Sequence, residues 1–188
     1  MKKIILVLML AACSLFSNTL AQIKEKGVIR IGIDGSSPPF SVAKDGGYSG
    51  FEILLIEGLV KEIFGDKGSK IQYVVTVGDD RIKAVQDNRV DLDIALISVT
   101  KEREKLVDFS DPYFSVNIGV LTRSDDNIRK VSDLNGKTIL AQPGTTVFDY
   151  FTKQGYNVVP CASANECFND LKSGKGDGYG DDNLLVFA

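Results

Sequence analysis

The sequence predicts an α/β protein built from two lobes, each with a parallel sheet covered by helices. Short β-rich runs alternate with amphipathic helical patterns, which favours parallel strands joined by right-handed crossovers. This pattern starts again after Gly136, which indicates a second lobe rather than a longer first sheet. The chain has 188 residues, of which 44% are hydrophobic and 25% charged, the composition of an ordinary globular protein.

The first lobe is expected to begin with a buried strand and to contain one long helix. Apolar residues dominate the run before Asp34, whereas glycine, serine and proline crowd the stretch after it and predict a loop. Apolar positions then recur every three or four residues up to Phe64, the spacing of an amphipathic helix. The expected elements are strand 28–33, loop 35–50, helix 52–64, strand 71–77, helix 81–86 and strand 92–97.

The second lobe is expected to follow a strand that crosses between the lobes. Within it, Ser163 and Glu166 have the spacing of a capping box, which predicts a helix that runs to Lys172. The other expected elements are strand 138–141, helix 146–154, strand 157–160 and strand 178–180. The resulting division is residues 22–116 for the first part of lobe one, 117–122 for the crossover strand and 123–188 for lobe two.

The N-terminus has the layout of a secretory signal peptide over residues 1–21. Two lysines precede an apolar run, and small residues up to Ala21 offer a cleavage site before Gln22. A second interpretation is a lipoprotein signal, because the run that ends at Cys13 resembles a lipobox. A buried N-terminal helix is disfavoured, since the sequence turns polar from Gln22 onward. Both export signals predict a protein of the periplasm, lipid-anchored in the second case.

Composition excludes several classes of site. The chain has no histidine, which rules out Ser-His-Asp and Cys-His nucleophile pairs and histidine-ligated zinc. Its formal net charge of −3 weighs against nucleic acid or an anionic membrane as the main partner. Cys161 and Cys167 form an even pair after cleavage, and either a disulfide or two buried thiols fits their spacing. The aspartates near residue 180 lack the spacing of a calcium loop, so no metal is expected.

Polar side chains follow several predicted strands, and ligands of such sheets bind at the carboxyl ends of strands. Arg103 carries a planar fork that can hold a carboxylate, and Ser98 supplies a hydroxyl close by in the chain. Thr145 and Thr146 begin a helix whose backbone N–H groups and dipole favour an anion. Asp182 offers a carboxylate to an ammonium group.

Together these groups fit a zwitterion, with its carboxylate at Arg103 and the helix start and its amine at Asp182. Each group also has a structural alternative. Arg103 lies in a run of charged residues typical of a solvated surface, the two threonines are suited to capping their helix, and Asp182 fits a solvated loop. Their joint placement after strands of both lobes favours the binding interpretation.

Several motifs occur in order along the chain. They are 27–34 (GVIRIGID), 38–40 (PPF), 50–52 (GFE), 90–91 (VD), 99–103 (VTKER) and 107–113 (VDFSDPY). Together they resemble the polar amino acid family, family 3, of periplasmic solute-binding proteins, which serve bacterial ABC importers. The similarity runs from about residue 23 to the last residue. The Thr-x-x-Arg motif followed by Asp-Phe-Ser-Asp-Pro-Tyr is its most specific part.

This resemblance implies the periplasmic-binding-protein fold, in which two α/β lobes joined by two crossing strands close on a ligand. It implies that Arg103 binds the ligand's carboxylate beside the Ser98 hydroxyl. Thr145 and Thr146 match the carboxylate donors of the second lobe, and Asp182 matches the aspartate that binds the amine.

The resemblance also implies roles for residues near the ligand side chain. Asp34 matches a polar residue that faces this side chain, and Leu96 offers its backbone carbonyl to the amine. Arg81 lies where members for acidic and sulfur amino acids carry an arginine. Arg81 therefore favours a polar or acidic ligand, whereas Asp34 favours an amine or hydroxyl donor. Pairing of Arg81 with Asp34, Asp79 or Asp80 is the alternative. Gln142, directly after a predicted strand, completes the set.

The chain departs from the family pattern at three places. Ser37 and Gly78 stand where members for glutamine or basic amino acids carry aromatic rings, which weighs against those ligands. Leu54 replaces a second acidic residue after the Gly-Phe-Glu motif. The sequence stops at Ala188, where family members continue. We therefore expect a C-terminally truncated protein that lacks the second crossover and the end of lobe one.

The sequence thus predicts an exported monomer that binds a polar amino acid and delivers it to the permease of an ABC importer. No catalysis, cofactor or nucleic acid partner is expected. A periplasmic dehydratase-like enzyme of the same fold is one alternative, with Asp34 as its candidate catalytic carboxylate. A ligand-binding sensor domain of a membrane receptor is the other, and it would require a transmembrane helix further along the chain.

Overall fold

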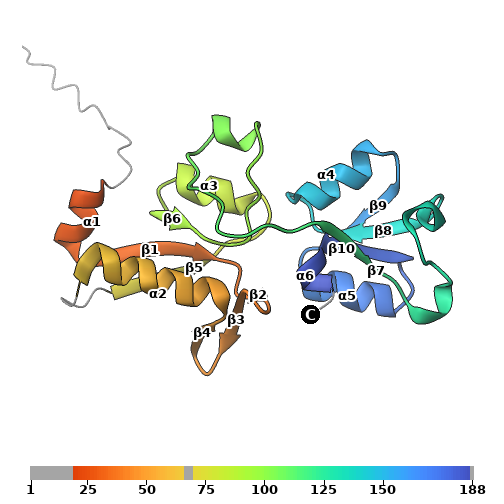
Figure 1. Ribbon diagram of the computed structural model, residues 1–188, viewed down its shortest axis with the longest axis horizontal. Helices are drawn as coiled ribbons and strands as arrows, with labels where there is room; N and C mark the ends of the chain where they lie inside the picture. The colour runs from red at the N-terminus through yellow and green to blue at the C-terminus, as the bar shows by residue number, and fades with distance from the viewer. Residues whose placement is uncertain (1–18, 66–69, 187–188) are drawn as a thin grey trace, which may run out of the picture.

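The computed structural model describes residues 19–65 and 70–186, which form two α/β lobes side by side (Figure 1). Residues 1–18 of the expected signal peptide 1–21, including Cys13, lie outside the described residues, whereas its last residues begin α1. Residues 107–117 run between the lobes as an extended segment (Figure 1). No helix in the described ranges is long and apolar enough to cross a membrane.

The first lobe contains a parallel sheet in the order β5-β1-β6 and a small antiparallel sheet formed by β2, β3 and β4. Its elements are α1 (Leu20–Lys26), β1 (Val28–Ile33), β2 (Ser36–Ser37), β3 (Ser41–Lys44), β4 (Gly47–Ser49), α2 (Phe51–Phe64), β5 (Lys70–Val75), α3 (Asp80–Gln86), β6 (Leu92–Asp93) and the 3-10 helix η2 (Arg103–Lys105).

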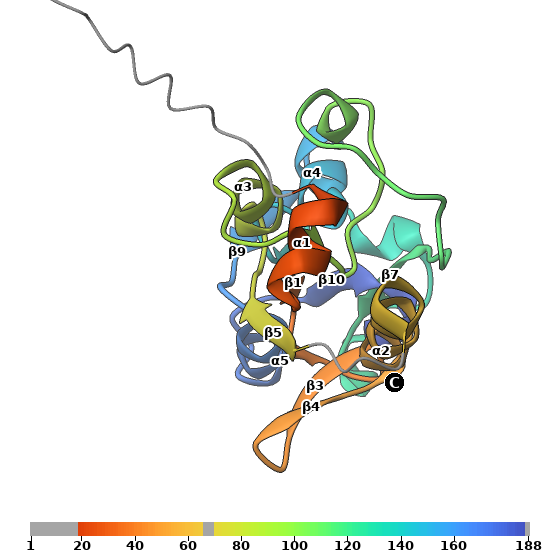
Figure 2. The ribbon, with the colours of Figure 1, turned by 90° about the vertical axis from the view of Figure 1, so that its left-hand side faces the viewer.

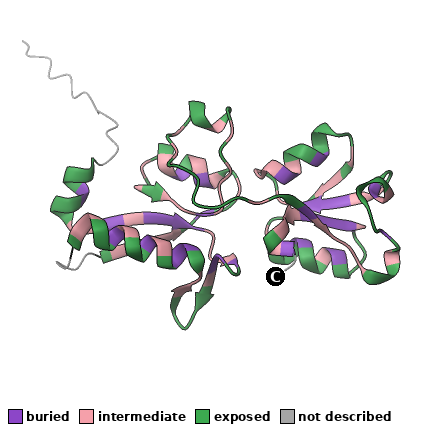
Figure 3. Cartoon of the chain, in the orientation of Figure 1, coloured by how far each residue is buried: buried purple, intermediate pink, exposed green. Residues whose placement is uncertain are grey.

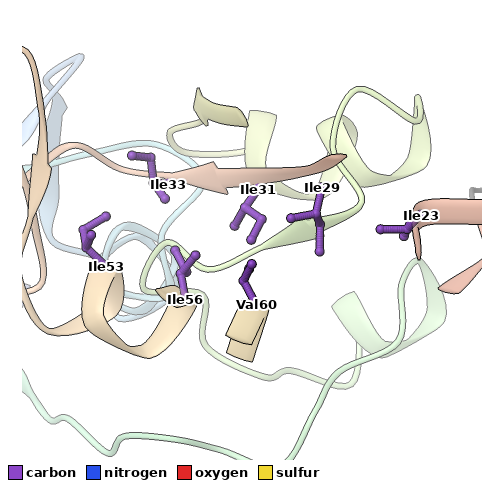
Figure 4. Close-up of a cluster of buried hydrophobic side chains, with 7 residues drawn as sticks. All are labelled: Ile23, Ile29, Ile31, Ile33, Ile53, Ile56 and Val60. Atoms are coloured by element: carbon purple, nitrogen blue, oxygen red, sulfur yellow. The ribbon is translucent and has the colours of Figure 1, made fainter. Parts of the chain in front are cut away.

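The core of the first lobe lies between β1 and α2. Side chains on a strand alternate between its faces, so every second residue of β1 points toward the helix. The helix packs against them with apolar residues spaced three or four positions apart. The packed residues are Ile29, Ile31 and Ile33 of β1 and Ile53, Ile56 and Val60 of α2, with Ile23 of α1 at the end of the strand (Figure 4). Figure 2 shows α1 at this outer end of the lobe.

Two parts of the first lobe differ from the sequence expectation. Residues 35–50 contain a sheet of the three strands β2, β3 and β4 instead of a plain loop, and Phe40, between β2 and β3, is buried. The strand expected over 92–97 is shorter, because only Leu92–Asp93 pair with β1. Leu96 then adopts a left-handed backbone with φ 57°, which turns the chain away from the sheet.

The second lobe is built on a four-stranded sheet in the order β7-β10-β8-β9. Its elements are β7 (Ile118–Leu121), the 3-10 helices η3 (Ser124–Asp126) and η4 (Val131–Leu134), β8 (Thr138–Ala141), α4 (Thr146–Lys153), β9 (Asn157–Pro160), α5 (Ala164–Lys172), β10 (Gly178–Asp182) and α6 (Asn183–Val186). Strands β8, β9 and β10 are parallel, whereas β7 runs antiparallel to β10. β7 therefore covers most of the expected crossover 117–122 and is hydrogen-bonded into the second sheet.

Helices cover both faces of the second sheet, with α4 on one side and α5 on the other (Figure 1). Ile139 of β8 packs with Phe151 of α4, while the neighbouring Leu140 packs with the α5 side. Buried residues accordingly concentrate in the strands and on the inner faces of the helices (Figure 3). A disulfide joins Cys161 to Cys167 and ties the end of β9 to α5, which resolves the alternatives for this cysteine pair.

Candidate functional site

A pocket lies between the two lobes at the carboxyl ends of their strands, where α/β sheets place ligands. All nine residues singled out from the sequence line it: Asp34, Arg81, Leu96, Ser98, Arg103, Gln142, Thr145, Thr146 and Asp182. Asp34 directly follows β1, Gln142 directly follows β8 and Asp182 ends β10. The alternation of strands and helices thus brings together residues that are far apart in the sequence.

Six further residues line the pocket: Ser37, Gly78, Val147, Ala164, Asp181 and Leu185. Asp181 was within reach of sequence reasoning, because it neighbours Asp182 at the end of a predicted strand. Ser37 and Gly78 drew attention only as positions without an aromatic ring. Val147, Ala164 and Leu185 are helical residues with no chemical signature, and only the packing of the lobes identifies them.

Arg103 is half-buried at the start of η2. Its Nη1 donates to the Ser98 carbonyl at 2.8 Å and its Nη2 to the Gly144 carbonyl of the second lobe at 2.9 Å. Burial lowers the pKa of Arg103, and the nearby Arg81 guanidinium lowers it further. A guanidinium has five N–H groups, so within the described chain Arg103 retains unused donors, and its side chain lines the pocket. Ser98 contributes its carbonyl to this arrangement, while the Thr100 hydroxyl accepts from the Arg103 N–H at 3.2 Å.

Arg81 is only 7% exposed, and backbone carbonyls surround its guanidinium. Its Nε donates to Gly78 at 2.9 Å, and its Nη1 donates to Ala95 at 2.9 Å and Leu96 at 3.0 Å. Its Nη2 donates to Gly144 at 3.0 Å. Within residues 19–65 and 70–186 it makes no ion pair, so these carbonyls take the place of the aspartate partners considered from the sequence.

The Gly144 carbonyl therefore accepts hydrogen bonds from both first-lobe arginines. Glycine is required here for two reasons. Its φ of +75° lies in the left-handed region, and a Cβ would stand 2.4 Å from the backbone nitrogen of Asp79 in the first lobe. The absence of a side chain thus lets the two lobes approach at this point.

The start of α4 supplies the second-lobe wall of the pocket. The Thr145 hydroxyl accepts from the Phe148 N–H at 3.1 Å as the N-cap, and it donates to the Gln142 carbonyl at 2.7 Å. Its single hydrogen is therefore engaged within the turn. Thr146, the first residue of the helix, lines the pocket beside it. The helix start combines a positive dipole end with pocket-facing polar groups.

Three carboxylates line the same pocket as these arginines, those of Asp34, Asp181 and Asp182. Asp34 accepts through Oδ1 from the Ser36 N–H at 2.9 Å and from the hydroxyls of Ser36 and Ser37 at 2.8 and 2.9 Å. Asp181 accepts from the Tyr179 hydroxyl and, at 2.8 Å, from the Asp182 N–H.

The Asp182 side chain has no hydrogen-bond donor among the described residues. Burial raises its pKa to about 6, and repulsion from Asp181 adds to this rise. Asp182 is thus the carboxylate of the pocket whose desolvation is least compensated.

Glu52 supports the pocket from behind, and the sequence analysis missed this role. It lies fully buried in the first turn of α2. Its Oε1 accepts from the Leu96 N–H at 2.9 Å and from the Tyr113 hydroxyl, while its Oε2 is buried without a partner in the described chain. Glu52 thereby ties α2 to the pocket loop at Leu96 and to the segment that crosses between the lobes.

Replacing Glu52 by glutamine tests the cost of burying this carboxyl. Burial raises the pKa of Glu52 from 4.5 to about 7. The folded state therefore binds a proton that the unfolded state has lost, and its stability falls as the pH rises between these values. Glu52→Gln removes this dependence. Relative to wild type, its unfolding free energy should rise by up to about 3 kcal/mol between pH 4.5 and pH 8, measured by urea denaturation followed by circular dichroism.

Glu57→Gln is the matched control, because Glu57 is exposed on the same helix. Its stability should follow that of the wild type across the whole pH range. Parallel pH profiles for wild type and Glu52→Gln would contradict the assignment.

Comparison with known proteins identifies the fold and its relatives. Residues 29–177 match the bacterial extracellular solute-binding proteins, family 3. The glutamine-binding protein of Geobacillus stearothermophilus is 34% identical over 92% of this chain and 67% of its own length. The L-glutamate/L-aspartate-binding protein of Pseudomonas aeruginosa is 31% identical, and the match covers 92% of this chain and 61% of that protein.

A solved structure gives the same result in three dimensions. The cysteine-binding protein of Campylobacter jejuni superposes with a TM-score of 0.84 at 37% identity, over 90% of this chain and 69% of the other. The chain thus spans about two thirds of the length of these relatives. With the family match over residues 29–177, these similarities establish that the chain belongs to family 3 of the bacterial extracellular solute-binding proteins.

Proposed function

We propose that this protein binds a free amino acid between its lobes and delivers it to an ABC importer. The main support for this proposal is that one pocket contains both a positively and a negatively charged side chain, Arg103 and Asp182. Among the described residues, Arg103 retains N–H donors without an acceptor and the Asp182 carboxylate has no donor, and both side chains line the pocket. A zwitterion presents the complementary charges. The relatives named above bind glutamine, glutamate and aspartate, or cysteine, which share only their α-amino and α-carboxylate groups.

In this proposal the α-carboxylate binds Arg103 and the start of α4, including Thr146. The α-ammonium binds Asp182, with the Leu96 carbonyl as a second acceptor. Ser98, Gln142 and Asp34 surround the remainder of the ligand, while Arg81 shapes the pocket wall through its backbone contacts. Each charge-assisted hydrogen bond contributes roughly 1.5–3 kcal/mol, so a few of them support capture from dilute solution.

Closure of the lobes supplies the signal for delivery. The Gly144 carbonyl contacts Arg81 and Arg103 across the pocket, so a ligand held at the same place lies between both lobes. The closed form is then the species that a membrane permease recognises. The protein acts in this scheme as a periplasmic monomer that captures without catalysis, exported by its N-terminal signal or anchored through a lipid on Cys13.

Arg103→Ala tests the assignment of the carboxylate site. Loss of two charge-assisted hydrogen bonds should weaken amino acid binding by at least roughly a hundredfold. Isothermal titration calorimetry against the common L-amino acids and cystine measures this directly. Arg89→Ala, which removes an exposed arginine paired with Asp80 in the same lobe, serves as the control and should bind normally. Unchanged affinity in Arg103→Ala would refute the proposed carboxylate site.

Gly144→Ala tests whether binding requires the approach of the lobes at this residue. Its Cβ would meet the Asp79 backbone at 2.4 Å, so affinity should fall by roughly tenfold or more. Gly136→Ala is a matched control, because Gly136 has a similar φ of +73° but open space around it. Both variants carry the same backbone strain, and only Gly144→Ala should lose affinity. Equal affinities would show that closure at Gly144 is not needed.

A further inference from the structure

We infer that the ligand's side chain carries no negative charge and donates hydrogen bonds, so the pocket rejects glutamate and aspartate. This inference rests on the proposed function, since it names the class of amino acid that the same pocket takes. Two observations carry it: the arginine nearest the side-chain region is occupied by the backbone, and carboxylates outnumber guanidinium groups around the pocket.

Arg81 is the only basic group, apart from Arg103, among the described residues that line the pocket. Holding an acidic side chain bidentately requires two free N–H groups on one face of the guanidinium. Backbone carbonyls occupy four of the five N–H groups of Arg81, at 2.9–3.0 Å. Releasing them would leave the carbonyls of Gly78, Ala95 and Leu96 without this donor, at a penalty for each group left unpaired.

The carboxylates of the pocket, by contrast, keep capacity to accept further hydrogen bonds. Asp34 uses Oδ1 for its three local hydrogen bonds, and no described group donates to its Oδ2. Asp181 also lines the pocket, and each of its two carboxylate oxygens accepts one hydrogen bond, which leaves room for a second donor. An amide, hydroxyl, thiol or cationic group can therefore donate to these oxygens, whereas a carboxylate cannot.

The count of charged groups around the pocket also disfavours an acidic ligand side chain. Three carboxylates, those of Asp34, Asp181 and Asp182, line the pocket together with the two guanidinium groups of Arg81 and Arg103. Once a zwitterion satisfies Arg103 and Asp182, two carboxylates and the engaged Arg81 remain around its side chain. Burial is the main reason that the pKa values of Glu52 and Asp181 are raised, and repulsion from Asp34 adds to both shifts, in line with a pocket that disfavours an added negative charge.

Isosteric pairs of ligands isolate the effect of charge. Titration calorimetry at pH 7.5 compares L-glutamine with L-glutamate and L-asparagine with L-aspartate, together with L-cysteine, L-serine and L-arginine. We expect at least one uncharged or cationic amino acid to bind roughly tenfold or more tightly than both acidic ones. L-Glutamate or L-aspartate binding as tightly as the best of the others would overturn the inference while leaving amino acid binding intact. No binding by any of them would overturn the proposed function itself.

Asp34→Asn then tests the source of the discrimination. Asparagine keeps the Oδ1 that accepts from Ser36 and Ser37, so the local turn retains its hydrogen bonds while one negative charge is lost. The ratio of acidic to uncharged affinity should rise by about tenfold. A general loss of folding or of binding would lower the affinities for acidic and for uncharged amino acids equally and would leave their ratio unchanged.

Asp125→Asn is the control, because Asp125 is exposed on η3 and does not line the pocket. Its affinity ratio should equal that of the wild type. An Asp34→Asn ratio that also equals the wild-type value would show that carboxylates of the pocket do not set its selectivity.

Discussion

The site depends on one backbone carbonyl, that of Gly144, which accepts from Arg81 and Arg103 across the space between the lobes. Each arginine also donates to carbonyls of the first lobe. The hydrogen bonds to Gly144 therefore hold the second lobe against the first at this point. A side chain at residue 144 would collide with Asp79, which explains why this contact is made by glycine. The strand ends of both lobes meet around this point and form the pocket walls.

Two buried ionisable side chains, those of Arg81 and Glu52, shape the wall of the pocket. Arg81 donates to backbone carbonyls of the pocket wall. Glu52 accepts from the backbone N–H of Leu96 and so holds the Leu96 loop against α2. Hydrogen bonds to backbone carbonyls offset the desolvation of Arg81. Glu52 accepts from the Leu96 N–H and the Tyr113 hydroxyl, but burial still raises its pKa to about 7. What remains open toward a ligand is one arginine with free donors and a set of acceptor carboxylates. This asymmetry, rather than the presence of arginine alone, determines which side chains fit.

Much of this arrangement could be predicted from the sequence, because buried strands such as 138–141 are largely apolar and their carboxyl ends mark the pocket. The β2–β4 sheet could not, since its short strands have the composition of a loop. The role of Glu52 was also beyond reach. Its partners Leu96 and Tyr113 lie 44 and 61 residues away along the chain, and no local pattern links them. The engagement of Arg81 by carbonyls likewise exists only in the folded chain.

The central claim is that both lobes hold one amino acid at the same time, and hydrogen exchange measured by mass spectrometry tests it most directly. Exchange is compared with and without a saturating mixture of the common L-amino acids. We predict that peptides covering residues 96–103 of the first lobe and 142–146 of the second become protected together, because ligand contacts and closure order both segments. Protection confined to one lobe, or absent from both, would contradict the account.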